Sequence, residues 1–302
     1  MYLDEIQVKK TNSQRYETVC GWLMSCLPVL GFIIFGLIPM IVAIYLAFCQ
    51  TTDFSLGSAY FVGFENFEYV LGDYKFWEAG FNTLFFTLSL PICLILSLCV
   101  AFLLTKKIKG KKVFRTIFFI PYVCSVVAVA VMWKEIFNPV YGTVNNMLGL
   151  HYDKWNWLGS VKLFRILVIL ISVWGGCGYS IILYSAALTN INPTLYEAAK
   201  MDGANSFQCF TNITLPGVSP TTFYLFITGL IGSLQSFATL HVLNASGEPD
   251  GAGITIGFYL YNQIFQSDNM GLASASALIL TFFILIITVI QFAISRKWVN
   301  YD

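Results

Sequence analysis

The side chains that could perform catalysis or hold a metal are dispersed along this chain of 302 residues. The two histidines, His151 and His241, stand far apart, and the eight cysteines include no C-x-x-C pair. Six of the eight cysteines lie in or beside apolar stretches, where cysteine packs as a small hydrophobic residue. The phosphate-binding pattern G-x-x-x-x-G-K followed by Ser or Thr does not occur. We therefore expect no catalytic residue, no metal site and no cofactor bound by this chain.

Small and polar side chains gather on two apolar segments and suit the passage of a polar solute. On one segment they recur at offsets of 0, 3, 4 and 7, which is one helix face: Gly229, Gly232, Ser233 and Ser236, with Gln235 beside them. On the other, three glycines before an aromatic residue indicate a point where the helix opens: Gly175, Gly176, Gly178 and Tyr179. Two interpretations stay open, because hydroxyls, amides and aromatic faces bind sugars whereas glycine and serine also pack membrane helices.

The polar segment 189–220 is too long and too regular for a passive connection. The pair Asn192-Pro193 is a helix start, because asparagine caps a free amide and proline needs none. Gly203 can adopt the left-handed conformation that ends a helix. A second short helix can then begin at Asn205 or Ser206 and close at Pro216. We therefore predict a helix–turn–helix lying across one face of the membrane.

This segment resembles the EAA loop of binding-protein-dependent ABC importer permeases. The matching residues are Glu197-Ala198-Ala199, Asp202-Gly203-Ala204, Phe210, Ile213, Leu215-Pro216 and Pro220. Further stretches are similar to the carbohydrate-uptake branch, and to the first permease of a heterodimeric pair: residues 61–67, Phe118 to Pro121 with Trp133 and Phe137, and Tyr259 to Tyr261 with Phe265 and Gly271. The resemblance covers roughly residues 20–298. It implies an all-α membrane protein with the transmembrane-domain fold of a type I ABC importer.

The resemblance also implies partners and site residues. The loop helix would dock in a groove of an ATP-binding subunit through Glu197, Ala198, Ala199, Asp202, Gly203 and Ala204. A dimer of such subunits would hydrolyse ATP with Mg, beside a second homologous permease, and an extracytoplasmic solute-binding protein would deliver sugar. Sugar-facing positions fall near Gly176 and Tyr179, and at Gly229, Ser233 and Ser236, with Gln235 beside them. Serines stand where the maltose-type member has amides, which puts maltose itself in doubt.

The elements that must position these residues are membrane-spanning helices. The chain is 57% hydrophobic and 11% charged, against about a quarter charged in soluble domains. Each of six apolar runs exceeds the roughly 20 residues that cross a bilayer: 21–49, 81–105, 113–137, 163–188, 221–243 and 272–294. Pro28 and Pro39 can kink the first run. Aromatic residues among acidic ones at 64–79 predict an interfacial helix.

The basic residues set the orientation of these spans. Twelve of the 17 lie in the N-terminus, the 106–112 loop with Arg115, the 189–220 loop and the C-terminus, so both termini are expected in the cytoplasm. The first polar residues run too long, and the first apolar run too far, for a cleavable signal peptide. We expect a cytoplasmic tail at 1–20 and a six-span permease domain at 21–298, multi-pass in the cell membrane, with a cytoplasmic coupling loop at 189–220, lipid around it and no nucleic-acid partner.

Two alternatives to sugar import remain. The same architecture could carry glycerol phosphate or another polar solute, although the scarcity of basic residues in the spans argues mildly against an anion. The chain could also be an autonomous channel or a secondary carrier. Transporters driven by protons or sodium commonly place ionisable groups within their spans, and no acidic residue lies in the middle of any span here.

Overall fold

The computed structural model describes residues 12–51, 56–105, 109–244 and 249–300. Four helices are long and apolar enough to cross a membrane: Tyr16–Ala47, Tyr74–Thr105, Val161–Asn190 and Met270–Ser295. In the same described residues, two bent pairs, Lys111–Val123 with Val126–Ile136 and Ser206–Gly217 with Ser219–Leu234, bring the number of spans to six when each pair is counted as one span. The predicted all-α, six-span fold is therefore confirmed, and the departures from it lie inside the spans.

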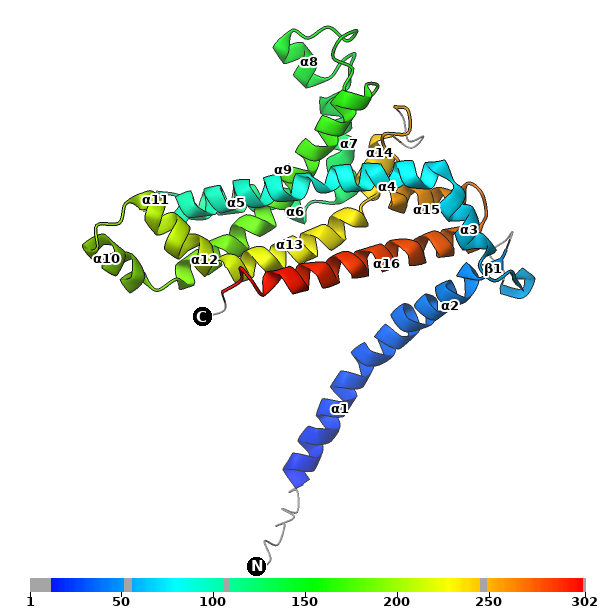
Figure 1. Cartoon of the computed structure of the whole chain (residues 1–302), viewed down its shortest axis with the longest axis horizontal. Helices are drawn as coiled ribbons and strands as arrows, with labels where there is room; N and C mark the ends of the chain where they lie inside the picture. The colour runs from blue at the N-terminus through cyan, green and yellow to red at the C-terminus, as the bar shows by residue number, and fades with distance from the viewer. Residues whose placement is uncertain (1–11, 52–55, 106–108, 245–248, 301–302) are drawn as a thin grey trace, which may run out of the picture.

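Figure 1 shows a bundle whose long helices run side by side. It contains α5 (Ser89–Thr105), α13 (Ser219–Leu234) and α16 (Met270–Ser295), and α9 (Val161–Asn190) packs along α5. We call one end of this bundle the α10 end, because α10 (Pro193–Met201) lies there, and the other the α15 end, after α15 (Ile256–Phe265). Helix α8 (Thr143–Leu148) stands away from the bundle at the top of the view, beyond α7 (Val126–Ile136), and α1 (Asn12–Phe32) departs from it at the bottom.

The first span is one long helix that begins earlier than expected. α1 passes through a π-helical stretch, η1 (Ile33–Leu37), into α2 (Ile38–Ala47). Pro28 lies inside α1, and Pro39 follows directly after the wide turn. Proline has no amide to donate, which explains why the regular bonding is lost before it. Only 6% of the most apolar window of this span is buried, so most of the span stands free of the bundle, whereas its end, α2, packs against α16 with Leu46 and Ala47 buried.

The second span extends further toward the α15 end than the apolar run did. It joins α4 (Tyr74–Thr87) to α5 within one helix of 32 residues. The interfacial helix predicted at 64–79 is therefore wrong in its second half: α3 (Glu65–Gly72) is a separate short helix, and Asp73 caps α4 by accepting from the Lys75 amide at 2.9 Å. Two two-residue strands, β1 (Cys49–Gln50) and β2 (Tyr60–Phe61), pair antiparallel before α3.

The third span is broken, which hydropathy alone did not reveal. α6 (Lys111–Val123) and α7 meet at 98°, because Cys124 and Ser125 adopt extended backbone. The fifth span is broken too: α13 ends at Leu234 rather than at 243, and α14 (Ala238–Leu243) follows after three non-helical residues. A second bend, of 60°, separates α13 from the short helices that precede it.

The helix opening expected at Gly175, Gly176 and Gly178 is not there. α9 is one uninterrupted helix of 30 residues. The third of these glycines has a packing role instead, because a β-carbon at Gly178 would collide with the backbone carbonyl oxygen of Phe118 and lie 2.9 Å from Cα of Phe119. The glycine thus permits the α6 and α9 backbones to touch.

Buried residues form a core between α5, α9, α13 and α16 near the α10 end. Tyr184 and Ile181 of α9 and Ala101 of α5 are almost completely buried there, together with Val218. A second cluster joins α7, α9 and α14, and a third joins α2, α4, α15 and α16. The helices that surround the middle of the bundle are thus fixed at both ends.

Substituting Gly178 by alanine tests the close contact between α6 and α9. We expect Gly178→Ala to destabilise the folded protein by about 1–3 kcal/mol, the usual result of overpacking, because backbone cannot move aside as a side chain can. Gly175→Ala is the matched control, since a β-carbon there meets nothing within 4 Å. Thermal unfolding of the detergent-solubilised assembly measures both, and equal melting temperatures would contradict the contact.

Candidate functional site

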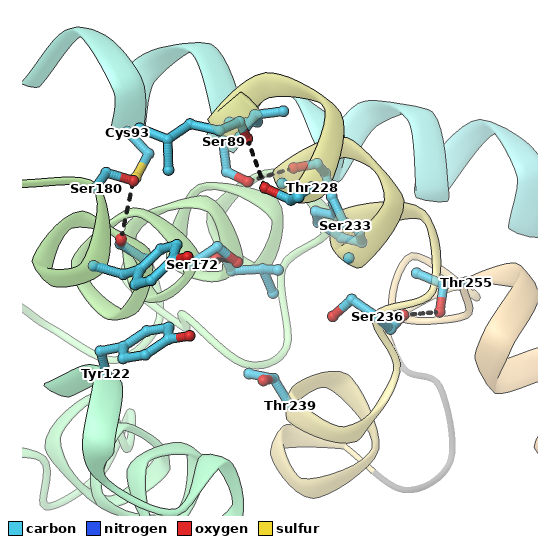
Figure 2. Close-up of a pocket in the computed structure, with 18 of the residues that line it drawn as sticks. Ser89, Cys93, Tyr122, Ser172, Ser180, Thr228, Ser233, Ser236, Thr239 and Thr255 are labelled. Carbon is cyan, nitrogen blue, oxygen red and sulfur yellow. Dashed lines mark hydrogen bonds between the residues drawn. The ribbon is translucent and has the colours of Figure 1, made fainter. Parts of the chain in front are cut away.

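A cavity of about 490 Å³ lies between α5, α9, α13 and α14 (Figure 2). Tyr122 of α6 reaches it from just before the break in the third span, and Phe86 of α4 and Thr255 complete the wall. Its lining on α13 runs from Leu225 to Ser233, which is about 12 Å along the helix axis at 1.5 Å per residue. A cavity of this volume lies within the size range of small-molecule sites.

Hydroxyl groups dominate the polar part of this cavity. Ten of its nineteen lining residues carry one: Ser89, Tyr122, Ser172, Tyr179, Ser180, Thr228, Ser233, Ser236, Thr239 and Thr255. The labelled side chains in Figure 2 come from helices far apart in the sequence and surround the same space. Among the residues described, none that lines the cavity is charged.

The α15 end of the cavity is closed by a loop that a buried asparagine holds. The Asn82 side chain has no exposed surface, and its amide donates to the carbonyls of Gly251 and Ile254, both at 3.0 Å. Its oxygen accepts from the Arg165 guanidinium at 2.9 Å, and that guanidinium lies over the rings of Phe81 and Phe85. This network joins α4, α9 and the loop before α15, so it fixes the position of Thr255 on the wall.

Aromatic rings form the other end of the cavity, toward α10. The rings of Tyr122 and Tyr179 are stacked, with centroids 5.0 Å apart and planes at 16°. The Tyr179 hydroxyl lies 3.2 Å from that of Tyr224 on α13. Three spans therefore meet at this floor through tyrosine side chains.

The structure brings together five of the six residues predicted for a substrate path. Gly176, Tyr179, Gly229, Ser233 and Ser236 line the cavity, whereas Gln235 does not. Gln235 lies in the break after α13, with an exposed side chain directed elsewhere. Ser236 is no longer on a helix, yet its carbonyl accepts from the Thr255 hydroxyl at 2.9 Å and the residue stays in the wall.

Packing and lining both occur on the small-residue face of α13. A β-carbon at Gly229 would collide with Leu90 of α5, so this glycine permits the two helices to approach. Gly232 meets nothing within 4 Å and opens onto the cavity. The two interpretations of the sequence thus apply to neighbouring residues.

Several lining residues were missed by sequence reasoning. Ser172, Gly176, Tyr179 and Ser180 recur at helical spacing along α9, and that pattern could have identified Ser172 and Ser180. Thr239 and Thr255 follow breaks in the helices, where periodicity carries no information. Tyr122 comes from a span whose bend the sequence did not indicate.

The predicted helix–turn–helix at the α10 end is present. The Asn192 side chain accepts from the Thr194 amide at 3.0 Å and caps α10. Gly203 adopts φ +81°, and the amides of Gly203 and Ala204 donate to the carbonyls of Lys200 and Ala199 at 3.1 and 2.9 Å. This paired bonding is a Schellman motif, which ends the helix through a left-handed residue.

A second helical segment follows the turn and joins the fifth span. Asn205 and Gln208 form a capping box at α11 (Ser206–Cys209), with bonds of 2.9 and 2.8 Å, so Asn205 rather than Ser206 is the cap. The expectation that Pro216 closes this segment is wrong: π-helical η3 (Phe210–Thr214) and α12 (Leu215–Gly217) continue through it. A residue early in α12 needs no amide bond to the preceding turn, which explains why proline is tolerated.

The loop is exposed on one side and attached to the spans on the other. Glu197, Ala198, Asp202 and Gly203 are exposed, and Ala199 and Ala204 are half-buried. The Tyr196 hydroxyl lies 2.9 Å from that of Thr214, and the ring of Phe210 contacts Phe102 of α5 edge-on at 5.4 Å. A displacement of α10 would therefore be passed to η3, and from there to α5 and α13.

The described part of the chain shows no group of three or more histidine, cysteine or acidic side chains that could hold a metal. What the site offers is an uncharged cavity within the spans and an exposed, regularly folded loop at one end. This combination is that of a membrane permease. A family model described as binding-protein-dependent transport system inner membrane component matches residues 93–300, and the chain belongs to that family.

Relatives of known assignment match over nearly their whole length. The multiple sugar-binding transport system permease protein MsmF of Streptococcus mutans is 33% identical over 92% of this chain and 96% of its own. The lactose transport system permease protein LacF of Rhizobium radiobacter is 30% identical, over 95% and 98%. The sn-glycerol-3-phosphate transport system permease protein UgpA of Yersinia enterocolitica is 30% identical, over 96% and 100%.

Solved structures show the same fold. A chain of a bacterial ABC transporter that imports the acidic polysaccharide alginate superposes with a TM-score of 0.80 at 28% identity, covering 94% of this chain and 99% of that one. A chain of the alginate transporter in complex with an alginate pentasaccharide-bound periplasmic protein gives 0.77 at 27% identity, covering 93% and 96%. The expected type I ABC importer fold is thus confirmed.

Replacing Asn82 by leucine tests the network that closes the cavity. We expect Asn82→Leu to lower the free energy of unfolding by about 3 kcal/mol, because three buried hydrogen bonds are lost and a guanidinium loses its acceptor. Asn146→Leu is the control, since Asn146 is exposed and makes one side-chain bond, to the Tyr141 carbonyl. Unfolding of the solubilised assembly in denaturant measures both, and a loss no larger than that of the control would refute the role given to Asn82.

Proposed function

We propose that this chain is one permease subunit of an ATP-driven importer and that it carries a sugar or oligosaccharide through the cavity between α5, α9 and α13. The observation that carries the proposal is the hydroxyl-lined, uncharged cavity, joined through α9 and α13 to an exposed loop at one end. Sugars are bound through many hydroxyl contacts and aromatic faces, and this wall supplies both. The sugar permeases among its relatives support the same cargo class.

The energy for import comes from partner subunits in this proposal. The helix α10 docks in a groove of an ATP-binding subunit, with Glu197 offering a carboxylate and Ala198 and Ala199 allowing close approach. Exposed Leu195, Met201 and Phe207 add apolar surface to that contact. ATP and Mg are held and hydrolysed by a dimer of these subunits, and neither is bound by this chain.

A second, homologous permease completes the path. The spans of this chain leave one long helix, Tyr16–Ala47, almost unburied, which is the exposure expected of a subunit made for assembly. A solute-binding protein delivers the cargo at the α15 end in this proposal, and the related alginate transporter, solved in complex with a pentasaccharide-bound periplasmic protein, supports such a partner. The α10 end and both termini face the cytoplasm in this proposal, which the charge asymmetry of the sequence supports.

Transport follows by alternating access. Closure of the ATP-binding subunits moves α10, and the Tyr196–Thr214 and Phe102–Phe210 contacts pass that motion to the spans. The cavity opens toward the binding protein in one state, and the tyrosine floor opens toward the cytoplasm in the other. Import of a glycerol phosphate is the second candidate, because a permease for that solute is among the relatives.

A valine at Gly203 tests the coupling role of the loop. The space around Gly203 is open, but its φ of +81° is a conformation that β-branched residues rarely adopt. We expect Gly203→Val to abolish ATP-dependent uptake and to reduce co-purification of the ATP-binding subunit, while Gly203→Asn, which tolerates this conformation, keeps both. Proteoliposome uptake and affinity capture measure the effect, and undiminished uptake in Gly203→Val would contradict a coupling role of the loop.

A bulky side chain in the cavity tests the substrate path. We expect Ser233→Trp to stop uptake of the sugar that the cognate binding protein carries, because the indole fills space that the cargo needs. The control is Gln235→Trp, two residues away and outside the cavity, which should leave uptake near its original rate. The initial rate of sugar uptake into proteoliposomes is measured for both variants, and equal rates would show that the cargo does not pass through the cavity.

A further inference from the structure

Most hydroxyl groups that line the cavity donate their proton to an acceptor in the wall. Six of the ten donate their proton to an acceptor inside the wall, at 2.7 to 3.5 Å: those of Ser89, Ser172, Ser180, Thr228, Ser233 and Thr255. Five of these acceptors are backbone carbonyls, and the sixth is the Thr87 hydroxyl, whose own proton goes to the Thr83 carbonyl. The dashed bonds of Figure 2 show several of these contacts.

A hydroxyl has one proton and two lone pairs, so each of these six presents only acceptor capacity to the cavity. Turning a proton toward a ligand would break the bond that the hydroxyl makes within the wall. In the described residues, the hydroxyls of Tyr122, Ser236 and Thr239 have no such bond and remain able to donate. Acceptors therefore outnumber donors on this wall.

Positive charge and amide donors are missing from the same wall. Its described lining contains no lysine, arginine, histidine, asparagine or glutamine. The nearby guanidinium of Arg165 is directed to Asn82 and to two phenylalanine rings rather than into the cavity. A carboxylate or a phosphate ester only accepts hydrogen bonds when ionised, and it would face lone pairs after losing its water.

We propose that this wall recognises its cargo as a hydrogen-bond donor, and therefore selects an uncharged sugar over a uronate or a phosphate ester. The inference rests on the proposed function, and it separates this chain from the relatives whose cargoes are named as glycerol phosphate and alginate. Sugar hydroxyls donate to the six acceptors, and Ser172, Ser180 and Ser233 become specificity-determining residues of the wall.

Protection from alkylation tests the inference without selection by the solute-binding protein. Ser233→Cys places a thiol on the wall of the purified permease–ATPase complex, and peptide mass spectrometry follows its reaction with a small neutral methanethiosulfonate apart from the eight native cysteines. The probes are methyl glucoside, glucuronate and glycerol 3-phosphate at equal concentration and ionic strength. We expect methyl glucoside to slow the reaction severalfold, because a sugar that occupies the cavity shields the thiol, and the two anions to have no effect.

A charge placed in the wall should reverse this preference. Ser172 is exposed to the cavity, so Ser172→Lys in the Ser233→Cys background should make glucuronate and glycerol phosphate protective. Ser172→Met, of similar length and no charge, should not.

Each outcome bears on one claim. In the Ser233→Cys protein without the lysine, equal protection by methyl glucoside and by the two anions overturns the inference. A lack of protection by all three probes overturns it too. ATP-dependent uptake with the cognate binding protein is measured in parallel on the unsubstituted importer. If the unsubstituted importer shows no such uptake, the proposed function itself is refuted. If it shows uptake and the three probes protect equally, only the proposed selectivity is refuted.

Discussion

A bilayer core offers no hydrogen-bond partner to the backbone, and this constraint explains where the helices of the protein break. Spans can lose helical bonding only where other protein groups or a polar space replace it. The break after α13 satisfies this condition, because Ser236 lies in it, lines the cavity and accepts a hydrogen bond from Thr255 through its carbonyl. The break in the third span lies beside the cavity: Tyr122 lines the wall two residues before Cys124, and the Cys124 amide donates to the Ile120 carbonyl within α6. At the α13 break, irregular backbone and polar cavity are thus one feature.

The two functional regions are linked by the regular parts of the same spans. α9 runs unbroken for 30 residues, about 45 Å at the helical rise, from near the Asn82 network to the cap of α10. It carries Ser172, Gly176 and Tyr179 along the way. An unbroken helix of this length moves as one rigid body, so a displacement of its α10 end also displaces the residues that it contributes to the cavity wall. The tyrosine floor, which joins α9 to α6 and α13, lies where that displacement alters contacts between helices.

The features that the sequence predicted are those with local causes. The number of spans follows from the apolar runs, and the start, turn and second start of the helix–turn–helix at the α10 end follow from Asn192, Gly203 and Asn205, whose side chains or conformations act within four residues. Features that depend on contacts between distant segments could not be predicted from the sequence. The glycines of α9 predicted an opening of the helix, but Gly178 instead permits the backbone of α6 to pack closely against α9. Gln235 and Ser236 are neighbours in sequence, yet the break turns one out of the cavity and keeps the other in it. Periodicity finds a helix face only as far as the helix extends.

The unsupported first span has a consequence for biogenesis. Helix Tyr16–Ala47 precedes the other spans in the chain and is apolar enough to enter lipid, and within its own subunit it packs mainly through its last part, α2, against α16. Its first part therefore needs no contact with the later spans to be stable in the bilayer. The fifth span differs, because the Ser236 carbonyl in its break finds its hydroxyl partner, Thr255, only after the loop before α15 has been made. Membrane insertion of this protein is thus divided between a first span that is mostly accepted by lipid alone and a later span that is completed by its neighbours.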